Sequence, residues 1–415
     1  MLNNEITKKI LNIRKIPKFH KTLKSCNIVS PNPRFMTVVI DISNKCNLRC
    51  RMCYFSHDKY FKADPVYLTP DTFSNMAENL LPYATTLTLS CGSEPLMSPY
   101  FIDILKIASK YNVPHIDFAT NGVLITKDKA SAIIKYGVTD LMLSLEAASK
   151  EIYEYIRRGA KFDRFLSNIK YLNKQKEALK SSTPALRFNI TLMRSNIEEV
   201  EKLVDLAAEL KVSYLDFRHI VIYDGLGMEK ESLVHYKELS DSWLKRAREK
   251  AEKLGLTILT IPAEFGAKEE NTKARKQKID KNRMKKYLNI LTRNPKYFIK
   301  SGYLQFMELI KKPIKKPKKQ IKQNKDRNSI YCTLPFNYTL INAGGHVLPC
   351  PHCHGVSEYG TISPDVSFED VWFNKKFREL RRNILTNNPP KMCRDCSRLS
   401  MYNIDEDKLS ISREV

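Results

Sequence analysis

The chain lacks the features of membrane-spanning and secreted proteins. No apolar run among its 415 residues reaches the roughly 18 residues that a transmembrane helix needs. The N-terminal stretch MLNNEITKKILNIRK has no apolar core of the kind that a secretory signal requires. No internal repeat is found either. We therefore expect a cytoplasmic protein, long enough for two or three domains and hydrophobic enough, at 42%, to bury a sizeable core.

Disulfide bonds are not indicated, although the chain has 10 cysteines. Eight of them fall into two tight groups, one near residue 50 and the other between residues 332 and 396. Cysteines clustered in this way in a cytoplasmic protein bind metal more often than they form disulfides. The remaining two, Cys26 and Cys91, stand alone in the sequence and are interpreted as ordinary thiols.

Positive charge is concentrated in one segment. Residues 268–327 hold 21 Lys+Arg and 5 Asp+Glu, so +16 of the net charge of +25 lies there. The prolines and lysines at its end, KKPIKKPKKQIKQNKDR, predict a basic insertion or linker over 263–328. It is either a solvated flexible excursion or a docking segment for an anionic partner. It lacks the aromatic interleaving of a base-stacking surface, so nucleic acid is disfavoured. An acidic carrier or an anionic membrane surface, with the protein peripheral to the membrane, is preferred as the partner of 268–327.

Short apolar runs alternate with helix-like segments between residues 35 and 262. The runs are Met36–Ile42, Thr85–Leu89, His115–Ala119, Leu141–Leu145, Leu186–Leu192 and Tyr214–Arg218. The helix-like segments are Pro70–Leu80, Ile102–Tyr111, Phe162–Leu179, Glu198–Leu210 and His235–Leu254. This alternation predicts parallel βαβ units. Six units suggest a partial or closed β/α barrel with its chemistry at the C-terminal ends of the strands, although an open doubly wound sheet gives the same alternation.

The first cysteine group directly follows the first predicted strand. In ISNKCNLRCRMCYF, Cys46, Cys50 and Cys53 have the spacing C-x3-C-x2-C. Three thiolates on one loop can each bind one iron of a cubane cluster, which leaves the fourth iron without a protein ligand. An open position of this kind is what a catalytic metal site keeps. A zinc site completed by His57 is the alternative, and the x3 spacing disfavours it.

This spacing and the motifs that follow resemble the radical S-adenosylmethionine (SAM) superfamily. That family usually has an aromatic residue before the third cysteine. Met52 stands there in this chain and supplies an apolar edge for adenine. The stretch SCGSEP (90–95) resembles the family's Gly-Gly-Glu-Pro turn, which binds the amino group of the cofactor's methionine. The resemblance implies an α/β fold with a partial (β/α)6 TIM-like barrel at 35–262, after a basic N-terminal extension at 1–34.

The resemblance also implies cofactor contacts at successive strand ends. Asn121 lies in a turn after the third strand, and Ser144 and Glu146 end the fourth. Arg157, in IRRG, matches a position that often meets the cofactor carboxylate, and Asn189 is a candidate for ribose contact. Polar groups at successive strand ends converge on one mouth of a barrel. The implied cofactor-binding set is Met52, Gly92, Ser93, Glu94, Asn121, Ser144, Glu146, Arg157 and Asn189.

The second cysteine group resembles the auxiliary-cluster module called SPASM, or its shortened form, the twitch domain. Cys332, Gly345 and Cys350 fit C-x12-G-x4-C, while Cys393 and Cys396 form C-x2-C. No cysteine follows. The resemblance therefore implies one auxiliary [4Fe-4S] cluster in a small C-terminal iron–sulfur domain at 329–402, before a tail at 403–415. Its ligands would be Cys332, Cys350, Cys393 and Cys396. Four ligands close the cluster, which favours electron transfer, and a zinc ribbon is the alternative.

Cys353 has three interpretations. It replaces Cys350 as a ligand, donates a hydrogen atom to a substrate radical as a catalytic residue, or is a spare thiol in PCPHCHG. The spare thiol is the simplest of the three.

The resemblance implies an enzyme that cleaves SAM reductively to a 5′-deoxyadenosyl radical and abstracts hydrogen from an unactivated C–H bond. A SAM-binding [4Fe-4S] cluster, a second, auxiliary [4Fe-4S] cluster, and a flavodoxin- or ferredoxin-type electron donor belong to that chemistry. About 35 residues precede the first strand, too few for a winged-helix peptide-recognition domain. We therefore favour a carbohydrate-like, cyclitol-like or other small-molecule substrate over modification of a ribosomally made peptide. A non-catalytic iron–sulfur electron carrier and a zinc protein that binds nucleic acid form the second class of alternatives.

Overall fold

The computed structural model describes residues 4–26, 28–29, 32–90, 92–263, 265, 332–351, 359–386, 388–394 and 396. The described residues up to Pro262 and from Cys332 onward belong to one compact unit. The basic segment 268–327, Cys91, Cys353 and the tail at 403–415 lie outside the described residues.

A nine-stranded sheet is the framework of the described chain, in the order β11-β10-β1-β3-β4-β5-β7-β8-β9. All neighbouring strands pair in parallel except β10 with β11. The strands are β1 (Met36–Ile40), β3 (Ala84–Thr88), β4 (His115–Thr120), β5 (Asp140–Ser144), β7 (Ala185–Leu192), β8 (Tyr214–His219), β9 (Thr257–Thr260), β10 (Tyr338–Ile341) and β11 (Val347–Leu348). The six runs predicted from the sequence are β1, β3, β4, β5, β7 and β8, each within two residues of its predicted ends.

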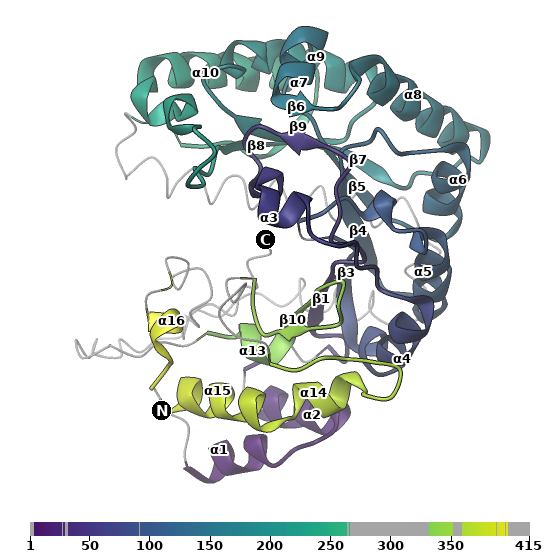
Figure 1. Ribbon diagram of the computed structural model, residues 1–415, viewed down its shortest axis with the longest axis vertical. Helices are drawn as coiled ribbons and strands as arrows, with labels where there is room; N and C mark the ends of the chain where they lie inside the picture. Colours follow the sequence, from purple (N-terminus) through teal and green to yellow (C-terminus); the bar gives the residue numbers. More distant parts are fainter. Residues whose placement is uncertain are drawn as a thin grey trace, which may run out of the picture. The chain divides into compact units, whose positions relative to one another are not determined.

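Helices cover the outer side of this curved sheet (Figure 1). They are α4 (Pro70–Leu80), α5 (Phe101–Ala108), α6 (Lys127–Lys135), α7 (Lys150–Ile156), α8 (Phe162–Ala178), α9 (Val200–Glu209) and α10 (Lys237–Lys253). The strands turn apolar side chains to the helices, as where Phe118 on β4 meets Phe101 on α5 edge-on at 5.3 Å. Polar residues occupy the opposite face, where Ser144, Asn189 and Asp216 are in register on β5, β7 and β8.

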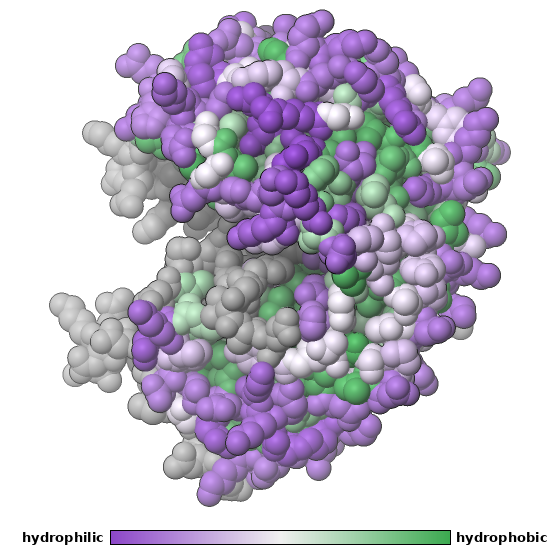
Figure 2. Space-filling model, in the orientation of Figure 1, coloured by the Kyte–Doolittle hydropathy of each residue, from purple (hydrophilic) through white to green (hydrophobic). Residues whose placement is uncertain are grey.

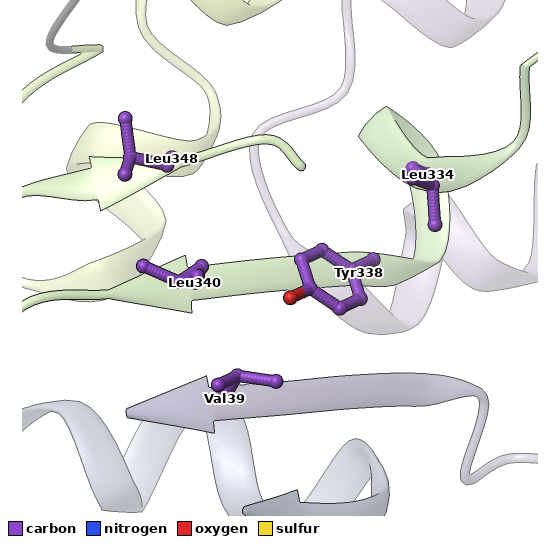
Figure 3. Packing of buried hydrophobic residues seen from close by; sticks show 5 residues of the cluster. All are labelled: Val39, Leu334, Tyr338, Leu340 and Leu348. Carbon is purple, nitrogen blue, oxygen red and sulfur yellow. The ribbon is translucent and has the colours of Figure 1, made fainter. Parts of the chain in front are cut away.

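The C-terminal module extends the barrel sheet. Strand β10 pairs in parallel with β1, and Tyr338 is in register with Thr37. The helices of this module are α13 (Leu334–Asn337), α14 (Phe368–Trp372), α15 (Lys375–Leu385) and α16 (Lys391–Arg394). Figure 3 shows Val39 of β1 facing side chains of the module, namely Leu334, Tyr338, Leu340 and Leu348. Module and barrel therefore share a hydrophobic core at this sheet edge.

The basic N-terminal extension forms two helices, α1 (Asn4–Leu11) and α2 (Ile16–Ser25), that pack on the C-terminal module. The ring of Phe19 meets Phe373 edge-on at 5.3 Å. Glu369 of α14 accepts a 2.9 Å hydrogen bond from the backbone N–H of Ile16 and forms a 2.7 Å ion pair with Lys15. The apolar face of α2 is thus buried against protein. None of the helices within the described residues is long and apolar enough to cross a bilayer.

Candidate functional site

Cys46, Cys50 and Cys53 lie on the loop that follows β1. Its middle part is strand β2 (Arg49–Cys50), which pairs antiparallel with β6 (Arg157–Arg158). The backbone N–H of Cys53 donates to the carbonyl of Cys50 at 3.1 Å. These backbone hydrogen bonds hold the second and third cysteines in a fixed turn.

Burial dominates the electrostatics of the three thiols. It raises the pKa of Cys46 to about 12 and that of Cys50 to about 11, and it also raises the pKa of Cys53. Each thiol therefore keeps its proton until a metal displaces it. Three soft thiolate donors on one loop suit an iron–sulfur cluster. Within the described ranges, no three Cys, His, Asp or Glu side chains are grouped so as to hold a metal ion, and the ligand set stays a prediction.

Glu94 is buried between the ends of β3 and β4, with 3% of its surface exposed. Its Oε1 accepts hydrogen bonds from the Thr120 hydroxyl at 2.7 Å and the Leu96 N–H at 3.1 Å. Its Oε2 accepts from the Asn121 N–H at 2.8 Å. Burial raises the pKa of Glu94, and these hydrogen bonds oppose that rise. The carboxyl group is therefore rigidly aimed, as the binding of an ammonium group requires.

Gly92 allows the cysteine loop to pack on the end of β3. A Cβ atom at this position would lie 2.4 Å from the Tyr54 hydroxyl oxygen and 2.6 Å from the Phe55 ring. Both aromatic residues directly follow Cys53. Ser93 donates a hydrogen bond from its hydroxyl to the carbonyl of Ser43. The SCGSEP turn thus contacts the loop that carries the cysteines.

Glu146 and Arg157 bind each other. Their side chains are 1% and 7% exposed, and Arg157 donates to both carboxylate oxygens, from Nε to Oε2 and from Nη2 to Oε1, the latter at 2.9 Å. The remaining nitrogen, Nη1, lies 3.7 Å from the Cys50 sulfur. Burial alone would lower the pKa of Arg157, but the charge of Glu146 raises it. The guanidinium therefore stays charged beside the cysteine loop.

Ser144 and Asn189 are in register on neighbouring strands. Among the described residues, Asn189 Oδ1 is a buried acceptor without a hydrogen-bond partner, so it is open to a ligand hydroxyl. Met52 packs against a buried apolar cluster formed by Ile156, Met193 and Met228. An apolar surface of this kind suits an adenine base, and an open acceptor suits a ribose hydroxyl.

The structure adds residues that the sequence did not single out. Asn47, inside the cysteine loop, accepts a 2.8 Å hydrogen bond from the amide of Asn121. Asn196 is 1% exposed and donates to the carbonyls of Glu146 and Thr191, both at 2.8 Å. The position of Asn47 in KCNLRC is a usable signal, because the loop reaches the strand ends. Nothing in the sequence around Asn196 marks it.

The four cysteines predicted to hold the auxiliary cluster lie near enough to one another in the C-terminal module for their charges to interact. Burial raises the pKa of Cys332 to about 12, and the charges of Cys350, Cys393 and Cys396 add to that rise. Cys332 and Cys350 pack against the core cluster of Figure 3. The fold therefore brings thiols that are up to 64 positions apart in the sequence into one module. Cys353 lies outside the described residues, so its role stays a prediction.

Two family models match this chain. Residues 40–207 match that of the Radical SAM superfamily, and residues 332–397 match the iron–sulfur cluster-binding domain SPASM. A probable GTP 3′,8-cyclase of Sulfurisphaera tokodaii is 22% identical over 52% of this chain and 64% of its own length. The Fe-coproporphyrin III synthase of Methanosarcina barkeri is 26% identical over 54% of this chain and 55% of its own length. The chain thus matches less than two thirds of the length of either relative.

Among solved structures, Streptococcus suis SuiB bound to S-adenosylmethionine is similar in fold. The TM-score is 0.56 at 16% identity, and the match covers 88% of this chain and 72% of SuiB. The strand order and helix layer described above therefore form a partial barrel, followed by a small iron–sulfur domain.

Proposed function

The chain belongs to the radical SAM superfamily and carries an iron–sulfur cluster-binding SPASM domain, and from this premise we propose a function for the site. The protein cleaves S-adenosylmethionine reductively and abstracts hydrogen from a C–H bond of a small molecule. The observation that carries the proposal is the contact of the cysteine loop with polar residues that follow successive strands. The backbone N–H of Glu94 donates to the carbonyl of Lys45, the amide of Asn121 donates to Asn47, and Arg157 lies beside the buried Cys50. Cys332, Cys350, Cys393 and Cys396 would hold one auxiliary cluster, which would supply a site for electron transfer.

The bound cluster and cofactor supply the radical, and the residues of this chain bind and orient them. Cys46, Cys50 and Cys53 hold the first [4Fe-4S] cluster. Glu94 receives the amino group of the cofactor's methionine, because its carboxyl group is fixed by three hydrogen bonds. Asn189 offers its open oxygen to the ribose.

The other expected cofactor residues have less direct roles. Gly92 and Ser93 seat the cysteine loop on β3, and Met52 lines the adenine surface with Met193 and Met228. Glu146 acts through Arg157, since the two side chains saturate each other. We assign the auxiliary cluster to Cys332, Cys350, Cys393 and Cys396. They belong to the C-terminal domain, for which we propose the limits 329–402.

A small-molecule substrate is supported by the names of the sequence relatives, a GTP cyclase and a coproporphyrin synthase. Within this class we favour a carbohydrate-like or cyclitol-like compound, since one auxiliary cluster fits a small-molecule substrate. Modification of a ribosomally made peptide is the second candidate, and the fold likeness to SuiB, solved also with its precursor peptide, is the observation that favours it.

The test uses anaerobically reconstituted protein, dithionite and SAM. Candidate hydroxylated metabolites and candidate precursor peptides are deuterated and supplied in turn, and deuterium in the released 5′-deoxyadenosine is measured. Transfer from a small molecule supports the proposal, and transfer from peptides alone replaces it with the second candidate. A non-catalytic electron carrier would retain iron and sulfide but form no 5′-deoxyadenosine. Bound zinc without sulfide would exclude both the radical SAM enzyme and the electron carrier.

A further inference from the structure

Helix α2 turns a row of lysines away from the protein. The apolar side of the helix is buried, while Lys18, Lys21 and Lys24 are exposed. Side chains three positions apart lie close together on one face of a helix, so these lysines form a stripe. In the part of the chain that the structure describes, none of the three forms an ion pair with a carboxylate. The positive charge of the stripe is therefore uncompensated.

Two neighbouring helices expose further cations. Helix α1 packs on both α2 and α15. The sequences of the three helices hold 10 Lys+Arg and 2 Asp+Glu, and that of α2 holds no acid. Their exposed cations, which we call the cationic surface, are Lys8, Lys9, Lys18, Lys21, Lys24, Lys375, Lys376 and Arg382. Figure 2 shows mainly hydrophilic side chains along the edge of the molecule where Figure 1 places α1 and α15.

Like charges are crowded where α15 meets the N-terminal helices. Burial lowers the pKa of Arg14, which lies between α1 and α2, and the charge of nearby Arg378 on α15 lowers it further. Cations held close together repel one another, and anions placed against them relieve this repulsion. The cationic surface therefore has the charge to bind an anionic partner.

The chemistry of this partner follows from what the surface contains. The chain's own basic segment is excluded as the occupant by its sign, because residues 268–327 carry a net charge of +16. The exposed large apolar side chains of the described residues lie outside α1, α2 and α15, so the partner is held by charge and not by apolar burial or base stacking. Seven of the eight cations are lysines. Their compact ammonium groups bind phosphate as point charges, whereas carboxylates favour the planar fork of arginine.

We propose that the cationic surface holds the protein at a membrane that contains anionic phospholipids. Clusters of lysine are attracted by the negative potential of such a membrane, and each lysine near it strengthens partitioning about fivefold. The attraction extends only over a Debye length, so salt weakens it. None of the residues that we assign to the two clusters or to SAM takes part, so the inference does not depend on the proposed function.

The test measures how the reconstituted full chain partitions onto sedimented vesicles, either of phosphatidylcholine alone or of phosphatidylcholine mixed with phosphatidylglycerol. The variant is Lys18→Gln/Lys21→Gln/Lys24→Gln. The matched control is Arg164→Gln/Lys245→Gln/Lys253→Gln, which neutralises three exposed cations on α8 and α10. We expect the wild type and the control to bind the anionic vesicles and the variant to bind them on the order of 100-fold more weakly. High salt should release the wild type.

Three results would overturn the inference. The first is a wild type that binds both kinds of vesicle equally, or neither. The second is equal binding of anionic vesicles by the variant and the control, which would assign the attraction to other cations, such as those of 268–327. The third is tighter binding of a DNA duplex than of anionic vesicles, with the duplex released by the variant, which would make nucleic acid the partner.

Circular dichroism of the variant should match that of the wild type, so that weaker binding reports lost charge and not lost fold. Should the triple variant unfold, Lys21→Gln alone provides the same test. We expect this single variant to bind anionic vesicles about fivefold more weakly than the wild type, and an unchanged affinity would overturn the inference.

Discussion

Replacing Arg157 by methionine tests how the chain stabilises the cysteine loop. The guanidinium is 7% exposed and is bound to both oxygens of Glu146, which is 1% exposed. Removing it leaves a carboxylate buried without its partner. Breaking a buried ion pair from one side costs about 3–5 kcal/mol, because the remaining charge is uncompensated. We expect Arg157→Met to lower the free energy of unfolding by that amount.

The assay is urea unfolding of the apoprotein under reducing conditions, followed by circular dichroism. Arg158→Met is the matched control, since it makes the same substitution at an exposed position one residue further on. The double variant Glu146→Leu/Arg157→Met should recover most of the loss, because no buried charge remains. A loss below about 1 kcal/mol in the single variant, or a double variant no more stable than the single one, would refute this reasoning.

Three further predictions follow from the described contacts. Burial raises the pKa of Glu94 above its ordinary value of 4.5. The contribution of Glu94 to the free energy of unfolding is therefore complete below pH 4.5 and is lost as the pH rises through the pKa of Glu94 in the folded state. Urea midpoints of Glu94→Gln should therefore fall less with rising pH than those of the wild type or of the exposed control Glu78→Gln, and parallel curves would contradict this. Gly92→Ala should displace Tyr54 and Phe55 at a cost of about 1–3 kcal/mol and lower the iron content after reconstitution, whereas full iron retention would argue against the close packing seen here. Arg381→Met removes the buried donor to the carbonyls of Pro335 and Trp372 and should destabilise the protein by about 1–3 kcal/mol. The control Arg382→Met, at an exposed position, should leave the stability unchanged. Equal urea midpoints for the two variants would contradict this prediction.

The sequence predicted the barrel strands because each is a short apolar run with a strong local signal. β7, for example, alternates buried and half-buried residues along its whole length. β9 was not predicted, since its four residues are all only partly buried and its pattern is weak. The pairing of β10 with β1 also escaped prediction. It joins residues about 300 positions apart, and parallel pairing at that distance leaves no local trace in the sequence.

Within the site, residue identities were easier to predict than their partners. The spacing of Cys46, Cys50 and Cys53 placed three thiols on one loop, and Glu94 and Asn121 fell at adjoining strand ends as expected. The sequence could not reveal that Glu146 and Arg157 would pair, because both were assigned to the cofactor independently. Outside the site, the cationic surface likewise joins α1 and α2 to α15, helices that meet only in the folded chain.

The most direct test of the central claim is 5′-deoxyadenosine formation by a variant with Cys46, Cys50 and Cys53 all changed to alanine. The wild type should hold about eight irons per chain in two cubane clusters and cleave SAM under dithionite. The triple variant should keep about four irons, in the auxiliary cluster, and form no 5′-deoxyadenosine, while a Cys26→Ala control should match the wild type. Continued SAM cleavage by the triple variant would contradict the account.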